Sequence, residues 1–274
     1  MPASKIQNLT VERDGQKLNV QVEGRETAPP VLLMHSLGTC LEMWDPQMAA
    51  LRRRFRVVRW DSRGHGKSSI PPKPANVEEL GRDALAIMDK LGIAKARLVG
   101  LSMGGQVGLW LAQFAPERVS HLVVANSAPK IGTAEIWNER IKQVTEGGMN
   151  AVIDATMKRW LKTETIAADG EALRRLRAMV LATDPKGYAA CCAVVRDADL
   201  RPKLADIRCP TTIISGQHDG ASPADAGKAA ADAIPGAKFV LLDASHASNW
   251  EQPQAFSRAT IGGLVRPKIG RAHV

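Results

Sequence analysis

Short apolar runs alternate with helix-like segments along most of this chain, and this alternation constrains its fold more than any other feature. Such apolar runs predict buried strands, and they occur at Val31–Met34, Arg56–Trp60, Arg97–Val99, His121–Ala125, Thr211–Ser215 and Lys238–Leu242. Helical periodicity predicts helices at Glu42–Arg53, Val77–Leu91, Met103–Phe114, Ala224–Ile234 and Pro253–Val265. The alternating residues Lys17–Val22 predict an early antiparallel strand. Together these segments predict an α/β fold, with a mostly parallel sheet flanked by helices.

One interval, residues 129–200, breaks the alternation. It contains no convincing strand, whereas helical periodicity recurs at Ala134–Thr145, Val152–Leu161 and Glu171–Leu181. An all-helical insertion between two strands is expected to lie over the carboxyl edge of the sheet, where open α/β folds bind ligands. We therefore predict a helical cap at 129–200, inserted into an α/β core made of residues 1–128 and 201–274.

Composition and charge limit the classes of partner. The chain has 274 residues, of which 45% are hydrophobic and 24% charged, the proportions of an ordinary folded protein. The first fifteen residues lack the apolar segment of a secretion signal, and no apolar run could span a bilayer, so we expect a cytoplasmic protein without a membrane partner. The net charge is +9, but the basic cluster Arg52–Arg56 lacks interleaved aromatic residues. We interpret this cluster as a solvated basic face and expect no nucleic-acid partner, while the positive field favours an anionic small molecule as substrate.

The four cysteines do not predict a metal site. Cys40, Cys191, Cys192 and Cys209 show no metal-ligand spacing, and in a cytosolic protein they are expected to be reduced. The sequence therefore predicts no metal and no cofactor. A cysteine nucleophile paired with a histidine stays open as an alternative, although no motif surrounds any of the four.

The clearest chemical signal is Gly100-Leu101-Ser102-Met103-Gly104. It lies directly between the strand Arg97–Val99 and the helix Met103–Phe114, which is the strand–turn–helix context of a nucleophile elbow. Glycines flank the serine because so sharp a turn leaves no room for side chains. The helix that follows directs the positive end of its dipole toward developing negative charge. The motif predicts that Ser102 is a nucleophile.

A serine nucleophile needs a general base, and six histidines compete for the role. In hydrolases with this elbow, the acid and then the histidine follow the serine along the chain. His121 follows Ser102 too soon, and His273 lies in the terminal segment. His218 is next to Asp219 and cannot easily be oriented by it. His246, in the loop after the last predicted strand, is the predicted base.

The carboxylate that orients the base is expected after the penultimate strand. Asp219 follows Thr211–Ser215 at that position. Its competitors are Asp225, which belongs to the next predicted helix, and Asp243, which is too close in sequence to His246. Asp219 is therefore the predicted acid.

The oxyanion of the reaction is expected to be bound by two backbone N–H groups. One belongs to the residue after the nucleophile, Met103, and the other to Leu37 in the loop His35-Ser36-Leu37-Gly38. His35 is interpreted as bracing its loop. The glycine-containing turn Asp61–Ser68, with His65, is interpreted as architecture.

Several of these segments together resemble the 3-oxoadipate enol-lactonases, a family of the α/β-hydrolase superfamily. The segments that carry the resemblance are Met34–Gly38, Trp44–Gln47, Asp61–Ser68, Gly100–Gly105 and Asn249–Pro253, with Ile136–Ile141 and Ala193–Asp197 in the cap. The elbow and the Asp61–Ser68 turn are typical of the superfamily. The His35–Gly38 loop and the cap segments point to the lactonases.

The resemblance implies a substrate and further site residues. The substrate would be a small anionic enol-lactone, opened by water to 3-oxoadipate through an acyl-enzyme on Ser102. In the cap segments, Arg140 and Arg196 are candidates to bind the substrate carboxylate, with Trp137 as a wall of the pocket. Trp160 is interpreted as part of the cap core.

Other functions stay open at this stage. The same three catalytic residues would serve another lactone or ester, such as an acyl-homoserine lactone or a xenobiotic ester, or a perhydrolase, because specificity depends on the cap. A ligand receptor that keeps the hydrolase fold is the alternative from a different class. Whether the chain forms a homo-oligomer is likewise open.

Overall fold

The computed structural model describes residues 6–265, so His273 and the rest of Arg266–Val274 lie outside the described residues. Eight strands form one sheet in the order β1-β2-β4-β3-β5-β6-β7-β8. The strands are β1 (Gln7–Arg13), β2 (Gln16–Glu23), β3 (Pro30–Met34), β4 (Arg56–Trp60), β5 (Ala96–Leu101), β6 (Val119–Ala125), β7 (Thr211–Gly216) and β8 (Lys238–Leu242). Strands β3–β8 are parallel, whereas β2 is antiparallel to both β1 and β4. The predicted α/β fold class is confirmed.

Two edge strands differ from the sequence prediction. The first strand, β1, is missing from the prediction because its residues are mostly exposed and polar, so it has no apolar signal. Lys238–Leu242 is a strand, but it is not buried as predicted. It is the outer strand β8, and Leu241 in it is 49% exposed.

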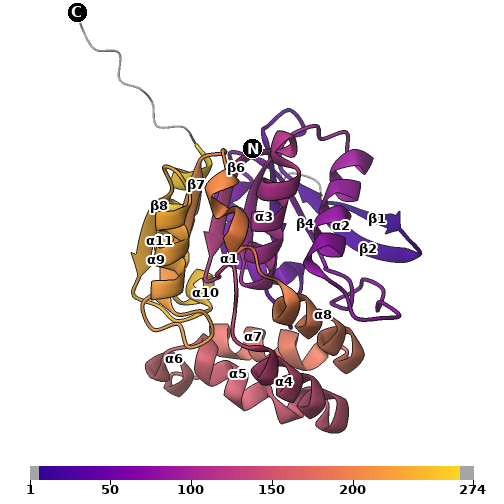
Figure 1. The fold of residues 1–274 in the computed structure, drawn as a ribbon, viewed down its shortest axis with the longest axis vertical. Helices are drawn as coiled ribbons and strands as arrows, with labels where there is room; N and C mark the ends of the chain where they lie inside the picture. Colours follow the sequence, from indigo (N-terminus) through magenta and orange to yellow (C-terminus); the bar gives the residue numbers. More distant parts are fainter. Residues whose placement is uncertain (1–5, 266–274) are drawn as a thin grey trace, which may run out of the picture.

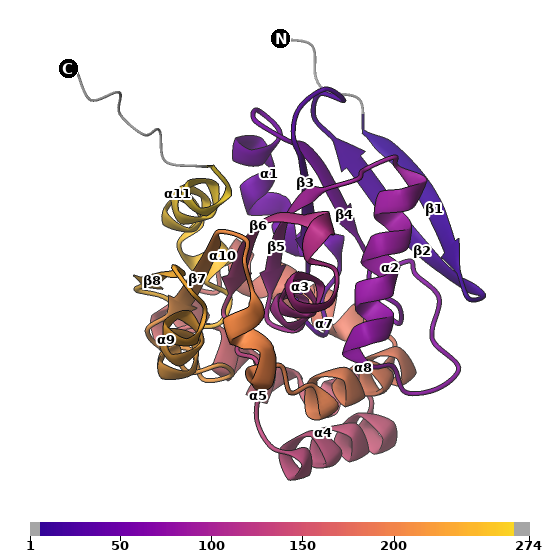
Figure 2. The same cartoon turned by 45° about the horizontal axis from the view of Figure 1, so that its top comes forward.

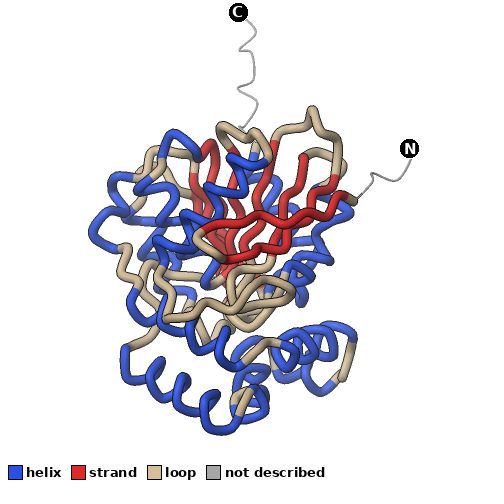
Figure 3. The backbone as a smooth tube through the Cα atoms, turned by 90° about the vertical axis from the view of Figure 1, so that its right-hand side faces the viewer, coloured by secondary structure: helices blue, strands red, loops and turns tan. Residues whose placement is uncertain are grey.

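Six helices pack around the sheet. They are α1 (Asp45–Leu51), α2 (Val77–Lys90), α3 (Met103–Phe114), α9 (Ala224–Ala233), α10 (Ser248–Glu251) and α11 (Pro253–Leu264). Helices α2 and α3 pack side by side (Figure 2), and Figure 3 shows helices on both sides of the strands. The predicted helix Glu42–Arg53 is instead a 3₁₀ turn, Leu41–Trp44, followed by α1. Pro46 explains the break, because proline fits the first turn of a helix but not its interior.

The connection from β6 to β7 contains only helices. They are α4 (Ala134–Gly147), α5 (Ile153–Trp160), α6 (Thr163–Ala167), α7 (Glu171–Ala182) and α8 (Pro185–Asp197), with a 3₁₀ turn at Met149–Ala151 and another at Arg201–Asp206. We call α4–α8 the helical layer. Figure 1 shows it gathered below the sheet. Among residues 6–265, no helix is both long and apolar enough to cross a membrane.

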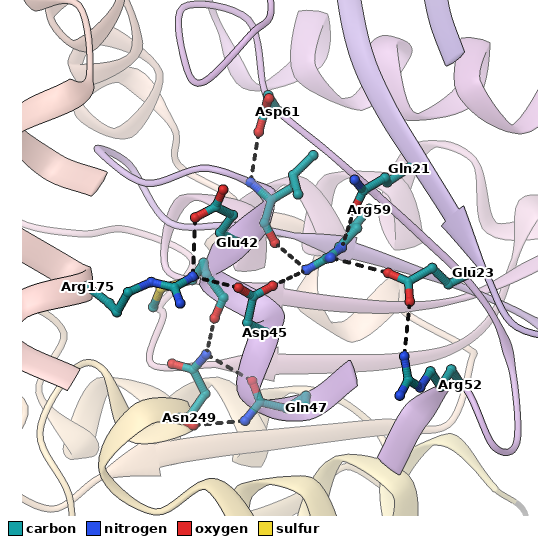
Figure 4. Close-up of polar contacts among 12 residues, drawn as sticks. Gln21, Glu23, Glu42, Asp45, Gln47, Arg52, Arg59, Asp61, Arg175 and Asn249 are labelled. Atoms are coloured by element: carbon teal, nitrogen blue, oxygen red, sulfur yellow. Dashed lines mark hydrogen bonds and ion pairs between the residues drawn. The ribbon is translucent and has the colours of Figure 1, made fainter. Parts of the chain in front are cut away.

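A chain of ion pairs joins the helical layer to the sheet (Figure 4). Arg59 of β4 contacts buried Glu23 at 3.2 Å and Asp45 at 2.6 Å. Asp45 in turn contacts Arg175 of α7 at 2.7 Å, and Arg175 also lies 3.3 Å from Glu42. Asp45 therefore forms one ion pair with the sheet, through Arg59, and one with the helical layer, through Arg175.

Candidate active site

Ser102 occupies a sharp turn between β5 and α3. Its backbone, at φ 56° and ψ −117°, lies in a region that L-residues rarely adopt. A Cβ on Gly100 would lie 2.0 Å from the carbonyl oxygen of Gly104, and one on Gly104 would lie 2.1 Å from that of Met34. Only glycine fits at both positions, so the local sequence Gly-x-Ser-x-Gly accounts for the turn.

Ser102 and His246 line the same cavity, which has a volume of about 280 Å³. Ser36 and Leu37, from the loop after β3, line it as well. The helical layer and its flanks supply the opposite walls, with Ile131, Gly132, Ile136, Trp137, Arg140, Arg159, Trp160 and Tyr188. The cavity thus lies between the carboxyl ends of the strands and the helical layer.

The predicted acid and base form a buried pair. His246 Nδ1 lies 2.9 Å from Oδ2 and 3.0 Å from Oδ1 of Asp219. Asp219 Oδ1 also accepts hydrogen bonds of 2.8 Å from the backbone N–H groups of Ala221 and Ser222. Because a carboxylate only accepts, the neutral imidazole carries its proton on Nδ1, and Nε2 is left as the basic nitrogen.

Among the described residues, no hydrogen bond joins the Ser102 hydroxyl to His246. Catalytic hydrogen bonds often form only when substrate is bound. The backbone carbonyl of Ser102 is held by the Ser127 hydroxyl at 2.7 Å. The serine's backbone is therefore held at its carbonyl, and the residue lines the cavity.

The loop that carries His246 is tied to the helical layer. The N–H of Ala247 donates to the carbonyl of Trp160 at 2.9 Å, and the Ser245 hydroxyl donates to that of Arg159 at 3.0 Å. Glu251 accepts from the N–H groups of Ser245 and Lys162 at 2.6 and 2.8 Å. Movement of the end of α5 would therefore move the histidine loop.

Two arginines of the helical layer face the cavity. Arg140 donates to the hydroxyls of Tyr188 at 3.1 Å and Thr156 at 3.2 Å, and its guanidinium lies 5.9 Å from the Trp137 ring centroid. Arg159 donates to the same Thr156 hydroxyl at 3.5 Å. Within residues 6–265, neither arginine forms an ion pair with a carboxylate. Both can offer N–H donors and positive charge to an anion in the cavity.

One interpretation of the helical layer needs correction, and a second is incomplete. Arg196 does not line the cavity, because its guanidinium pairs with Asp197 at 2.7 Å and with Asn138 at 2.8 Å. Trp160 does line the cavity, with its ring 5.7 Å from that of His246, although it is as buried as a core residue. Arg159 was not predicted. It follows Thr156 by three residues and so shares a face of α5 with it, but this spacing does not show that the face lines a cavity.

The competing acids and bases lie elsewhere. His218 is half exposed and lies 3.0 Å from Asp243, so these two candidates pair with each other. Asp225 belongs to the first turn of α9. None of these three residues lines the cavity.

The family model for the alpha/beta hydrolase fold matches residues 29–253. The chain belongs to the α/β-hydrolase family. It is 38% identical to 3-oxoadipate enol-lactonase 2 of Acinetobacter baylyi, over 97% of this chain and 99% of that protein. These findings confirm the resemblance predicted from the sequence and identify the chain as a hydrolase.

Two solved structures are similar over nearly their whole length. The enol-lactonase from Burkholderia xenovorans is 40% identical, with a TM-score of 0.92, and the match covers 95% of this chain and all of that one. A hydrolase from Pseudomonas aeruginosa is 41% identical, also with a TM-score of 0.92, and the match covers 96% and 99%. The helical layer is included in these matches, since the uncovered share of each chain is small.

In this α/β-hydrolase, two buried histidines brace the loop that contains Leu37. His35 Nε2 accepts from the N–H of Ser62 at 2.9 Å, and His65 Nε2 accepts from the N–H of Gly38 at 2.9 Å. Burial lowers the pKa of His35, and burial together with His35 lowers the pKa of His65 from its ordinary 6.5 to about 3. Both rings are neutral, and protonation of either Nε2 would break a bond that holds the loop.

We expect the free energy of unfolding to fall as the pH is lowered from about 7 to about 5. The unfolded chain binds protons at these histidines below about pH 6.5, whereas folded His65 does so only near pH 3, so acid favours the unfolded state. Urea denaturation of His65→Gln measures this, because glutamine can accept from Gly38 but does not titrate. The variant should show a weaker pH dependence than wild type. If the free energy of unfolding depended equally on pH in wild type and in His65→Gln, His65 would not be the source of the acid sensitivity.

The cysteines do not contribute to this cavity. All four are free thiols, and none lines the cavity. Burial raises the pKa of Cys40 and of Cys191 to about 12, and it also raises that of Cys192. Among the described residues, no group of three or more His, Cys, Asp or Glu side chains could hold a metal ion. The structure therefore gives no support to a cysteine nucleophile at this cavity.

Proposed function

We propose that this hydrolase opens 3-oxoadipate enol-lactone to 3-oxoadipate through an acyl-enzyme on Ser102. The observation that carries the proposal is the shared cavity. Ser102 faces it from a strained turn, and His246 faces it with Nδ1 held by buried Asp219. The similarity to enol-lactonases over nearly the whole chain supports the choice of lactone.

Acylation begins when His246 Nε2 takes the proton of the Ser102 hydroxyl. The serine Oγ attacks the lactone carbonyl carbon, and the oxyanion is bound by the N–H groups of Leu37 and Met103. The N–H of Met103 lies in the first turn of α3, where N–H groups have no acceptor within the helix. The ring carbon–oxygen bond then breaks, and His246 returns its proton to the enolate oxygen. The enol is a better leaving group than an alkoxide, and it tautomerises to the ketone.

Deacylation uses the same groups in reverse. His246 takes a proton from water, and the resulting hydroxide attacks the acyl carbonyl while the same two N–H groups bind the oxyanion. The bond between the acyl carbon and Ser102 Oγ breaks, and Oγ regains a proton from His246. The acyl group leaves as the second carboxylate of 3-oxoadipate. Asp219 stabilises the imidazolium in both halves without accepting the proton itself.

The helical layer would act as the cap that selects the substrate. Arg140 and Arg159, which pair with no carboxylate in the described part of the chain, supply positive charge to a cavity that is otherwise lined largely by apolar groups such as Ile131 and Trp137. A lactone with one carboxylate matches this arrangement, because its ring can contact the apolar walls while its carboxylate pairs with a guanidinium. Arg140 is better preorganised than Arg159 to bind a carboxylate, because two hydroxyl groups and the ring of Trp137 hold its guanidinium in place.

We expect Arg140→Met to raise KM for the enol-lactone about ten- to one-hundred-fold, the range for a lost charged hydrogen bond. Hydrolysis of the neutral ester p-nitrophenyl acetate should change far less, because it has no carboxylate. Arg196→Met is the matched control, since it removes the same charge outside the cavity. If Arg140→Met impaired both substrates equally, Arg140 would have no role in recognising the anion.

A further inference from the structure

Asn126 lies at the end of β6, between the acid and base loops. Its side chain is fully buried, and its φ of 46° lies in the left-handed region that asparagine tolerates better than most residues. Its N–H donates to the carbonyl of Ile214 in β7 at 2.7 Å. The backbone of the residue is thus fixed to the neighbouring strand β7.

The side-chain amide of Asn126 holds two groups at once. Nδ2 donates to Asp219 Oδ2 at 3.1 Å and to the carbonyl of Ser245 at 3.1 Å. Oδ1 accepts from the hydroxyl of Ser248. A carboxylate oxygen and a backbone carbonyl oxygen can only accept, so the end of the amide that faces both must be Nδ2, and the Ser248 hydroxyl then donates to Oδ1.

His246 Nδ1 lies close to both oxygens of Asp219, whereas the other donors divide between the two oxygens. The backbone N–H groups of Ala221 and Ser222 reach only Oδ1. Oδ2 receives His246 Nδ1 and Asn126 Nδ2. Without Asn126, Oδ2 would be held by the imidazole alone, and only the two N–H groups at Oδ1 would fix the carboxylate independently of the histidine.

We propose that Asn126 is a positioning residue for the reaction: it holds the carboxylate of Asp219 and the loop of His246 at fixed positions relative to the sheet. This role rests on the proposed function, in which Asp219 orients His246. Asn126 does not line the cavity and does not touch substrate, so it acts through Asp219.

Asn126→Gly is the sharpest test, because glycine keeps the left-handed backbone without strain and removes only the side chain. We expect kcat for p-nitrophenyl acetate to fall about ten- to one-hundred-fold with KM nearly unchanged, the effect of losing a hydrogen bond to a charged group. Asp169→Gly is the matched control, because Asp169 has the same kind of backbone, with φ 43°, in an exposed loop. It should leave kcat unchanged.

A double-mutant cycle with Asp219→Asn separates positioning from a structural effect. If Asn126 acts through Asp219, Asn126→Gly should cost less than about two-fold in the Asp219→Asn background. An equal loss in both backgrounds, or no loss in either, would overturn the proposal. Ser248→Ala provides a second variant should Asn126→Gly fail to fold. It frees the amide and should lower kcat about two- to ten-fold, again only when Asp219 is present.

The low-field proton NMR signal of His246 Nδ1–H gives a readout that needs no substrate. It should shift or broaden in Asn126→Gly and in Ser248→Ala, but not in Asp169→Gly. An unchanged signal in both variants would overturn the proposal whatever the substrate is. Failure of wild type to hydrolyse the enol-lactone would instead count against the proposed function and leave this measurement valid.

Discussion

Ser102→Ala is expected to lower kcat by about 10⁴- to 10⁶-fold, the loss found when the nucleophile of such a site is removed. The reason is that Ser102 is the serine held by the strained turn after β5 and exposed to the cavity beside His246. Without its hydroxyl, no acyl-enzyme can form. Binding and the oxyanion donors would leave only a small residual rate above that of water.

The first control is that the variant keeps the fold of the wild type. Alanine removes one oxygen, so circular dichroism and thermal unfolding should match wild type. Ser257→Ala, in α11 and away from the cavity, is the matched serine variant and should keep full activity. If Ser102→Ala retained a tenth or more of the wild-type rate, the nucleophile would have to be another residue.

Asp219→Asn should lower kcat about 10⁴-fold while leaving the fold intact. The substitution preserves shape, but the new amide can donate a hydrogen bond to His246 Nδ1. The imidazole proton would then move to Nε2, and the nitrogen that faces the cavity could no longer accept the serine proton. The loss should appear in kcat, since neither binding of the substrate nor the cavity walls change.

Asp243→Asn is the matched control for that variant, because Asp243 was one of the two competing acids in the sequence. It pairs with exposed His218 and with Lys162, not with His246. Steady-state rates within about two-fold of wild type are expected. A larger loss for Asp243→Asn than for Asp219→Asn would exchange the two assignments.

The elements predicted from sequence are those with a local signal. The strand–turn–helix around Ser102 needs glycine at two positions for steric reasons, so a five-residue motif is enough to predict it. The parallel strands β3–β7 were recognised because burial on both faces makes their sequences apolar. By the same logic β1 was missed and the burial of β8 was misjudged, because edge strands lack that signal.

Residues whose role depends on long-range contacts were not predictable. Asn126 gains its role from contacts with loops more than ninety positions further along the chain. Trp160 and Arg159 face the cavity because the end of α5 is bound to the histidine loop. Arg196, conversely, has the right chemistry in a lactonase-like segment, but Asp197 and Asn138 occupy its guanidinium. No periodicity in the sequence carries this information.

The most direct test of the account is steady-state hydrolysis of 3-oxoadipate enol-lactone, compared with p-nitrophenyl acetate and a homoserine lactone, with Ser102→Ala as control. We predict that kcat/KM for the enol-lactone exceeds that for the other two by at least about one-hundred-fold, and that Ser102→Ala abolishes it. Turnover of only the other esters would retain the serine hydrolase but contradict the substrate. A single burst of product without turnover on any of the three would contradict the enzyme and favour a receptor.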